Sequence, residues 1–219
     1  MIVAICCPLA GQVYAPAVDA LIEFVADTTK YVESLGGTVI RLIGYRGQTA
    51  MSRYALGKAA VDAGADWLMW SDDDMVLPKD CFQRLYAHGK KMVSGAYFSR
   101  SAADPLGRGQ YPLCAFKFVS DDLKPFEPPK FEPRGLQEVE VVGFGCLLMH
   151  VDVWNDVMKL CNGVPFRTEP NLTEDVWFEQ FARKAGHSVW LDTTIVAGHL
   201  KLILISDKNR EQIGGEPQS

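Results

Sequence analysis

The sequence lacks several features that would place a protein in a specialised class. Its 219 residues contain no apolar run of the ~18 residues that a membrane span needs. The six cysteines show neither CxxC nor Cys/His metal-site spacing, so we expect them to be reduced residues of the core. The formal net charge of −5 gives no overall basic footprint for nucleic acid. Since no basic segment precedes the first apolar run, we expect no signal peptide and a cytoplasmic protein.

What remains is an ordinary globular composition. Hydrophobic residues make up 48% of the chain and charged residues 22%, which is enough to bury a core without disulfides or metals. The length suits one sizeable domain. We expect a single domain over residues 1–205, followed by a polar tail over 206–219.

Strand-like and helix-like segments alternate at the start of the chain. The apolar runs at 2–7, 38–44 and 66–71 predict strands, and the segments at 17–37 and 49–65 have helical spacing of apolar residues. Short connections between such elements favour right-handed crossovers and a parallel sheet covered on both faces. In sheets of this kind, ligands bind beyond the carboxyl ends of the strands.

The remaining sequence predicts a more mixed arrangement. Further helices are expected at 78–89, 152–163 and 174–186, and further strands at 91–99, 138–151 and 188–192. The strand at 138–151 is interrupted by Gly143 and Gly145, and the proline-rich stretch 121–135 indicates a surface loop. The predicted fold class is therefore α/β, with a mostly parallel central sheet flanked by helices and a mixed second half.

Three consecutive carboxylates, Asp72, Asp73 and Asp74, follow the predicted strand at 66–71. In an extended chain Asp72 and Asp74 point the same way while Asp73 points to the other side. Two convergent carboxylates at a strand end can hold a hard divalent cation and leave open positions for phosphate oxygens. The alternative is a solvated acidic turn, in which aspartate is common.

The stretch ADWLMWSDDDMVLP (65–78) resembles the nucleotide-sugar-dependent glycosyltransferases of the GT-A fold, in particular the family 2-like group. Three more motifs follow in the order typical of that group: VVGFGCLLM, TEDVWFEQFARKAG (173–186) and VAGHL (196–200). The segment 52–66 also looks like the helix before the metal-binding strand. The resemblance implies a Rossmann-like GT-A fold, Mn²⁺ or Mg²⁺ as cofactor, and a nucleoside diphosphate sugar as donor, with a UDP-sugar expected first.

Carried over by position, the resemblance assigns roles to the acidic residues and the histidine. Asp74 would be the main metal ligand, Asp72 would touch the metal or the donor's ribose, and His199 would be a further ligand. Asp175 would be the general base of an inverting transfer, and Glu174 an acceptor or structural contact. Each has a purely structural alternative, because Glu174 and Asp175 also suit the first turn of a helix and a lone histidine is often a satisfied surface residue.

Other positions would contact the donor. The glycines Gly143 and Gly145 would let the backbone approach the donor sugar, although a β-bulge would also explain them. The loop PLAGQ and the second strand depart from the family pattern, which leaves the nucleotide base open. The complete set of predicted donor contacts is Pro8, Leu9, Ala10, Arg46, Gln48, Arg53, Asp72, Asp73, Arg100, Gly143 and Gly145.

Two other functional classes stay open from the sequence. A nucleotidyltransferase would also combine carboxylates, metal and nucleotide, but PLAGQVYAP holds one glycine and no lysine or arginine where a basic phosphate loop is expected. A non-catalytic nucleotide-sugar-binding module is the second alternative. The acceptor hydroxyl would belong to a glycan or a small molecule, with a hydroxymethylated DNA base as a further hypothesis.

Overall fold

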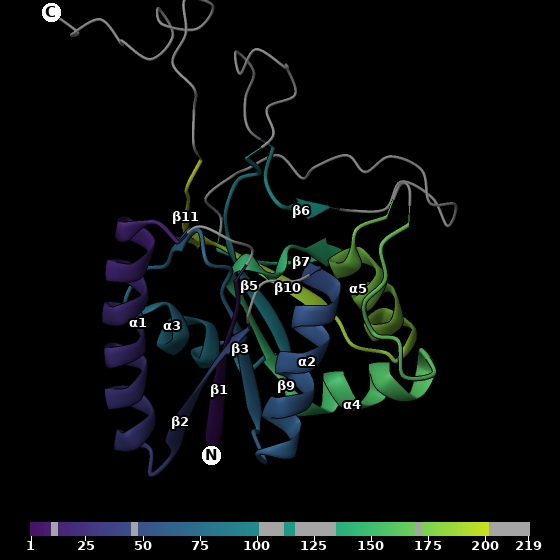
Figure 1. Ribbon diagram of the computed structural model, residues 1–219, viewed down its shortest axis with the longest axis horizontal. Helices are drawn as coiled ribbons and strands as arrows, with labels where there is room; N and C mark the ends of the chain where they lie inside the picture. Colours follow the sequence, from purple (N-terminus) through teal and green to yellow (C-terminus); the bar gives the residue numbers. More distant parts are fainter. Residues whose placement is uncertain (10–12, 45–47, 101–111, 117–134, 170–171, 202–219) are drawn as a thin grey trace, which may run out of the picture.

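A seven-stranded mixed sheet forms the centre of the computed structural model, which describes residues 1–9, 13–44, 48–100, 112–116, 135–169 and 172–201. The strands of this sheet are β1 (Ile2–Pro8), β2 (Thr38–Gly44), β3 (Trp67–Trp70), β5 (Met92–Ala96), β7 (Leu136–Val139), β9 (Leu147–His150) and β10 (Val189–Val196). They lie in the order β2-β1-β3-β9-β5-β10-β7 (Figure 1).

Most strands of this sheet run in one direction. β1 pairs in parallel with β2 and β3, and β5 pairs in parallel with β10. β9 is antiparallel to both β3 and β5, and β7 is antiparallel to β10. The carboxyl ends of β1, β2, β3, β5 and β10 therefore meet at one edge of the sheet, where ligands bind in folds of this kind. The predicted fold class, with its mixed second half, is confirmed.

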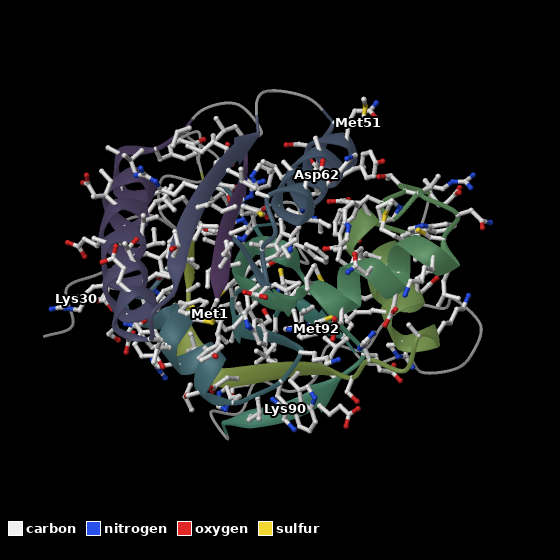
Figure 2. The ribbon with its side chains drawn as sticks, turned by 90° about the horizontal axis from the view of Figure 1, so that it is seen from below. Met1, Lys30, Met51, Asp62, Lys90 and Met92 are labelled. Atoms are coloured by element: carbon white, nitrogen blue, oxygen red, sulfur yellow. The ribbon has the colours of Figure 1, made fainter. Side chains whose placement is uncertain are left out.

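Helices cover both faces of the sheet. They are α1 (Ala15–Ser34), α2 (Thr49–Asp62), α3 (Cys81–Ala87), α4 (Val151–Leu160) and α5 (Glu174–Lys184). Val3 and Ile5 of β1 belong to the core beneath α1 and α3, whereas Ala4 and Cys6 belong to the core beneath α2, α4 and α5. Because β1 is buried on both faces, its sequence is a continuous apolar run rather than an alternating one. Side chains fill the space between the sheet and the helices (Figure 2).

Two small antiparallel pairs add to the main sheet. One joins β4 (Met75–Val76) to β11 (Gly198–His199), and the other joins β6 (Ala115–Phe116) to β8 (Val141–Val142). The first pair lies directly after the acidic triplet and brings a distant part of the chain beside it. Within the described ranges, none of the helices has the length and apolar character that crossing a membrane would require.

The prediction of one long strand at 138–151 is wrong. The segment forms β7, β8, a single 3-10 turn at Phe144–Cys146 and then β9, and these elements belong to two different sheets. The helix expected at 78–89 is shorter, and the strand expected at 188–192 is longer. All six cysteines are free, and five of them are buried, as predicted. The predicted tail at 206–219 and nearly all of the proline-rich loop lie outside the described residues.

Candidate functional site

The acidic triplet lines a cavity of about 310 Å³ at the carboxyl edge of the sheet. Asp72, Asp73 and Asp74 all contribute to its wall, although only Asp72 and Asp74 were expected to face one pocket. The reason is that the chain turns after β3 instead of staying extended, with the Met75 amide donating to the Asp72 carbonyl at 3.2 Å. Burial and then the charges of the three carboxylates raise the pKa of the neighbouring Cys7 thiol to about 12.

A buried arginine of α2 is the positive partner of Asp72. Arg53 is 3% exposed and donates from Nη2 to both oxygens of Asp72, at 3.0 and 3.1 Å. Its Nη1 donates to Glu174 Oε1 at 2.7 Å, and its guanidinium lies 5.0 Å from the centre of the Phe144 ring. Burial opposes the charge, but Asp72, Asp175 and Glu174 together raise the pKa of Arg53 above its usual value. Arg53 thus ties the end of β3 to the start of α5.

The two acidic residues that begin α5 differ in their contacts. Glu174 lines the cavity and binds Arg53; burial, followed by the charges of Asp175 and Asp72, raises its pKa even though Arg53 acts in the opposite direction. Asp175 accepts hydrogen bonds from the Thr173 hydroxyl and, at 2.9 Å, from the Val176 amide. Both carboxylates lie in the first turn of the helix, where the macrodipole also favours them.

Asp74 lies between two cationic or potentially cationic side chains. Its Oδ2 is 2.7 Å from Arg100 Nη1, and its Oδ1 is 3.4 Å from His199 Nε2. The pairing of β4 with β11 sets His199 directly opposite Met75, which is why a residue 125 positions later in the chain reaches the triplet. Burial favours the protonated acid, but contact with His199 and the charge of Arg100 lower the pKa of Asp74 below its ordinary value.

The pair formed by Asp74 and His199 fits a cation. His199 Nδ1 donates to the Phe98 carbonyl at 2.8 Å, because a carbonyl can only accept, and this contact fixes the ring with Nε2 toward Asp74. Asp74 Oδ1 is buried and has no hydrogen-bond partner of good geometry, the 3.4 Å contact being too long and poorly aligned to satisfy it. A carboxylate oxygen beside an imidazole nitrogen whose partner nitrogen is held by a carbonyl is the arrangement in which histidine ligands of metal sites are oriented.

These two side chains are not a complete protein cage. Among the residues that the structure describes, no three His, Cys, Asp or Glu side chains gather as a metal site. Ions such as Mg²⁺ are commonly held by one or two protein ligands together with phosphate oxygens of the substrate, and an imidazole ligand suits Mn²⁺ somewhat better. The residues present therefore fit a divalent cation that is bound jointly with a phosphorylated ligand.

The two glycines of VVGFGCLLM accommodate a tyrosine. Tyr97 is 5% exposed, and its hydroxyl accepts a hydrogen bond from the Gly145 amide at 3.1 Å. A Cβ atom at Gly143 would lie 1.8 Å from the Tyr97 hydroxyl oxygen, and one at Gly145 would lie 3.0 Å from Tyr97 Cζ. Tyr97 itself lines the cavity, whereas neither glycine is among the residues of its wall. The absence of side chains at both positions thus leaves room for the Tyr97 ring.

Replacing Gly143 with alanine is expected to lower the free energy of unfolding by about 1–3 kcal/mol, the usual cost of overpacking a filled core. Urea denaturation measures the loss. Because the added methyl would collide with the Tyr97 hydroxyl, Tyr97→Phe in the same chain should recover part of the stability. A double variant whose loss equals the sum of the two single losses would contradict this account.

The other predicted donor contacts are distributed around the cavity. Pro8 and Leu9 line it at the end of β1, and Arg100, half exposed, lines it beyond β5. Gln48 precedes α2 and lines a neighbouring pocket instead. Ala10 and Arg46 lie outside the described residues.

Sequence reasoning missed four polar or thiol residues of the wall, which are Thr49, Ser52, Ser99 and Cys114. Thr49 and Ser52 lie in the first turn of α2, whose amino end points to the site. Their spacing of three residues, just after a predicted strand end, is a signal that could have found them.

Comparison with solved structures places this architecture among known folds. Protein A197 from STIV is 19% identical with a TM-score of 0.61, over 92% of this chain and 87% of that one. GalNAc-T7, solved with UDP, GalNAc and Mn²⁺, is 9% identical with a TM-score of 0.54, over 92% of this chain and 43% of its own. The chain has a GT-A fold.

The GT-A assignment concerns the fold alone, because both identities are low. The inositol-1-phosphate CTP transferase from T. maritima has a TM-score of 0.47 at 12% identity, over 90% of this chain and 88% of its own, and is too distant to bear on the argument. No protein-family model and no curated protein sequence matches the chain. The chemistry of this GT-A domain must therefore be argued from its own side chains.

Proposed function

We propose that the protein is a metal-dependent glycosyltransferase that moves one sugar from a nucleoside diphosphate donor to an acceptor hydroxyl. The observation that carries the proposal is the facing pair of Asp74 Oδ1 and His199 Nε2, which suits a divalent cation at the carboxyl edge of a GT-A sheet. The fold is shared with GalNAc-T7, which was solved with UDP, GalNAc and Mn²⁺. A UDP-sugar is therefore the first donor to test.

In this proposal Asp74 and His199 hold Mn²⁺ or Mg²⁺. Asp72 binds the metal or the donor's ribose through the oxygen lone pairs that do not accept hydrogen bonds from Arg53. The bound cation would offset the negative charge that develops on the departing diphosphate. Arg100, half exposed and already beside Asp74, is placed to contact a diphosphate or the donor sugar. Pro8, Leu9 and Asp73 form the remaining wall around the nucleotide.

Asp175 is the proposed general base, which accepts the proton of the acceptor hydroxyl as that oxygen attacks the anomeric carbon. Glu174 has a different task in this proposal. Because Arg53 binds Glu174 on one side and Asp72 on the other, these three side chains fix the distance between the metal-binding end of β3 and the base at the start of α5. Such fixed placement of donor and base is a major source of rate enhancement.

Calorimetry with UDP, GDP, CDP and dTDP, each with Mn²⁺ and again with EDTA, tests the proposal. We expect one nucleotide to bind in a Mn²⁺-dependent manner, and Asp74→Ala to weaken that binding by about 100-fold or more, because loss of even an outer-shell partner of a metal ligand costs about 10–100-fold. Asp62→Ala, at an exposed aspartate of α2, is the matched control and should leave binding unchanged. If no nucleotide binds in the presence of the metal, the glycosyltransferase proposal fails.

A further inference from the structure

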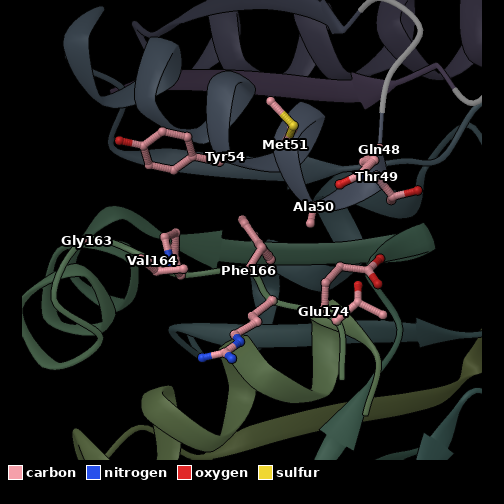
Figure 3. Close-up of a pocket in the computed structure, with 12 residues that line it drawn as sticks. Gln48, Thr49, Ala50, Met51, Tyr54, Gly163, Val164, Phe166 and Glu174 are labelled. Atoms are coloured by element: carbon pink, nitrogen blue, oxygen red, sulfur yellow. The ribbon is translucent and has the colours of Figure 1, made fainter. Parts of the chain in front are cut away.

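A second and larger cavity, of about 720 Å³, opens beside the site (Figure 3). One wall is the start of α2, and the other is the segment 163–168 between α4 and α5. Thr49 and Glu174 line both cavities, so the two spaces adjoin at the edge of the proposed catalytic site. Among the predicted donor contacts that the structure describes, Gln48 alone lines this second space.

Exposed apolar side chains gather in this cavity. Met51 is 68% exposed, Tyr54 37% and Val164 51%, and Phe166 is buried between them and the core. Figure 3 shows Met51 and Tyr54 on the α2 side, with Val164 and Phe166 across from them. Apolar side chains that are exposed together around a concave space mark a binding site more often than isolated ones do.

The two ends of the cavity differ in polarity. Tyr54 and Val164 lie toward one end in Figure 3, whereas Gln48, Thr49 and Glu174 lie toward the other. The polar end is the one that joins the acidic cavity. A ligand that fits both ends is therefore amphiphilic, with its polar group directed to the start of α5 and its apolar part against α2.

We propose that this cavity binds the acceptor, and that the acceptor is a hydroxyl compound with a flat aromatic body. The inference rests on the proposed glycosyltransferase function. An aromatic ring suits walls made of a thioether, a phenol and a phenyl ring, all of which make favourable contacts with ring faces and edges. The nucleotide base is a poorer candidate, because the donor cavity has its own wall from Pro8 and Leu9 at the end of β1.

With the acceptor in this cavity, the bonds that form and break in the sugar transfer can be stated. The acceptor hydroxyl, at the Glu174 end, gives its proton to the proposed base Asp175, the next residue of α5, and forms a new bond to the anomeric carbon. The bond from that carbon to the diphosphate oxygen breaks at the same time, and the nucleoside diphosphate leaves with the electron pair. The aromatic body stays on Met51 and Tyr54 throughout and sets the orientation of the attacking oxygen.

The test uses the whole chain, labelled with ¹³C on the methionine methyl groups and saturated with diamagnetic Mg²⁺ and UDP. Phenyl β-D-glucoside and methyl β-D-glucoside, which share one sugar, are the probes. Burial of the phenyl ring is worth about a tenfold or greater gain in affinity at ordinary transfer energies. The Met51 methyl signal should shift with phenyl β-D-glucoside at about tenfold lower concentration than with the methyl compound, while the signal of fully buried Met69 should not move.

Variants separate the possible occupants of the cavity. Met51→Ser should reduce the preference for phenyl over methyl β-D-glucoside severalfold and leave nucleotide affinity unchanged, whereas Ile22→Ser, at a similarly exposed apolar residue of α1, should change neither.

Three results would overturn the proposal: no Met51 response to the phenyl compound, no preference over the methyl one, or tighter binding of hexyl β-D-glucoside. A loss of nucleotide affinity in Met51→Ser would instead make this the base pocket. If the phenyl compound binds but no nucleotide does, only the glycosyltransferase function fails.

Discussion

Replacing Arg53 with methionine should lower the free energy of unfolding by about 3 kcal/mol, near the lower end of what breaking a buried ion pair costs. Arg53 is almost completely buried, and the variant would leave Asp72 and Glu174 without their cation. Methionine keeps most of the side-chain volume, so the loss reports on charge rather than on a cavity. The lower end is expected because 26% of the Asp72 side chain and 15% of the Glu174 side chain are exposed to water.

Urea denaturation of Arg53→Met measures this loss directly. Arg84→Met is the matched control, because Arg84 is 38% exposed and binds only at the surface, so its replacement should cost about 1 kcal/mol or less. Adding Asp72→Asn and Glu174→Gln to Arg53→Met should recover part of the stability by removing the unpaired charges. If Arg53→Met costs no more than the control, the bridge between β3 and α5 makes no net contribution to the fold.

The ion pairs of Arg53 with Asp72 and Glu174 could be predicted only in part from the sequence. Arg53 stands out as a candidate for binding the donor, but the structure pairs it with the protein's own carboxylates. A signal was present, because the buried positions of α2 include Arg53, Leu56, Gly57 and Ala60, at helical spacing on one face. A basic residue on a face that is otherwise small and apolar needs an internal anion, and the acidic triplet and the start of α5 supply it.

The first three strands and first two helices could be predicted because each carries its own local pattern. Continuous apolar strands, helical spacing and glycines at the helix ends identify them without reference to the rest of the chain. The same reasoning failed for 138–151, where apolar residues continue while the backbone changes from β8 to a 3-10 turn and then β9. At this break the Tyr97 side chain packs on the two glycines from 46 and 48 residues away, a contact that the local sequence does not encode.

The position of His199 depends on a pairing that local patterns do not encode. β4 and β11 have two residues each and show no alternation or turn signal. Their pairing is fixed by neighbours, with the Ala197 amide bound to Ala96 and the Leu200 amide bound to Asp74. Motif order suggested that His199 lies near the triplet, and the structure brings it to within 3.4 Å of Asp74.

The second large effect concerns the step of proton transfer. Asp175→Asn is expected to lower kcat by about 10²–10⁴-fold, which is what a positioned general base contributes. The affinity for nucleotide and Mn²⁺ should stay the same, because Asp175 makes its hydrogen bonds to Thr173 and Val176 and does not line the donor cavity. Release of nucleoside diphosphate from the sugar donor, in the presence of a hydroxyl acceptor, measures kcat.

Two variants make the test of Asp175 specific. Asp152→Asn, at the matching first-turn position of α4, removes a carboxylate from a helix start without touching the site, and kcat should be unchanged. Glu174→Gln keeps the side-chain shape but weakens the ion pair with Arg53, so it should reduce stability while lowering kcat less than Asp175→Asn does. If Glu174→Gln instead loses the larger factor in kcat at full nucleotide affinity, Glu174 is the base. In that case the raised pKa of its carboxyl, which burial and the charges of Asp175 and Asp72 cause against the effect of Arg53, suits a group that accepts a proton.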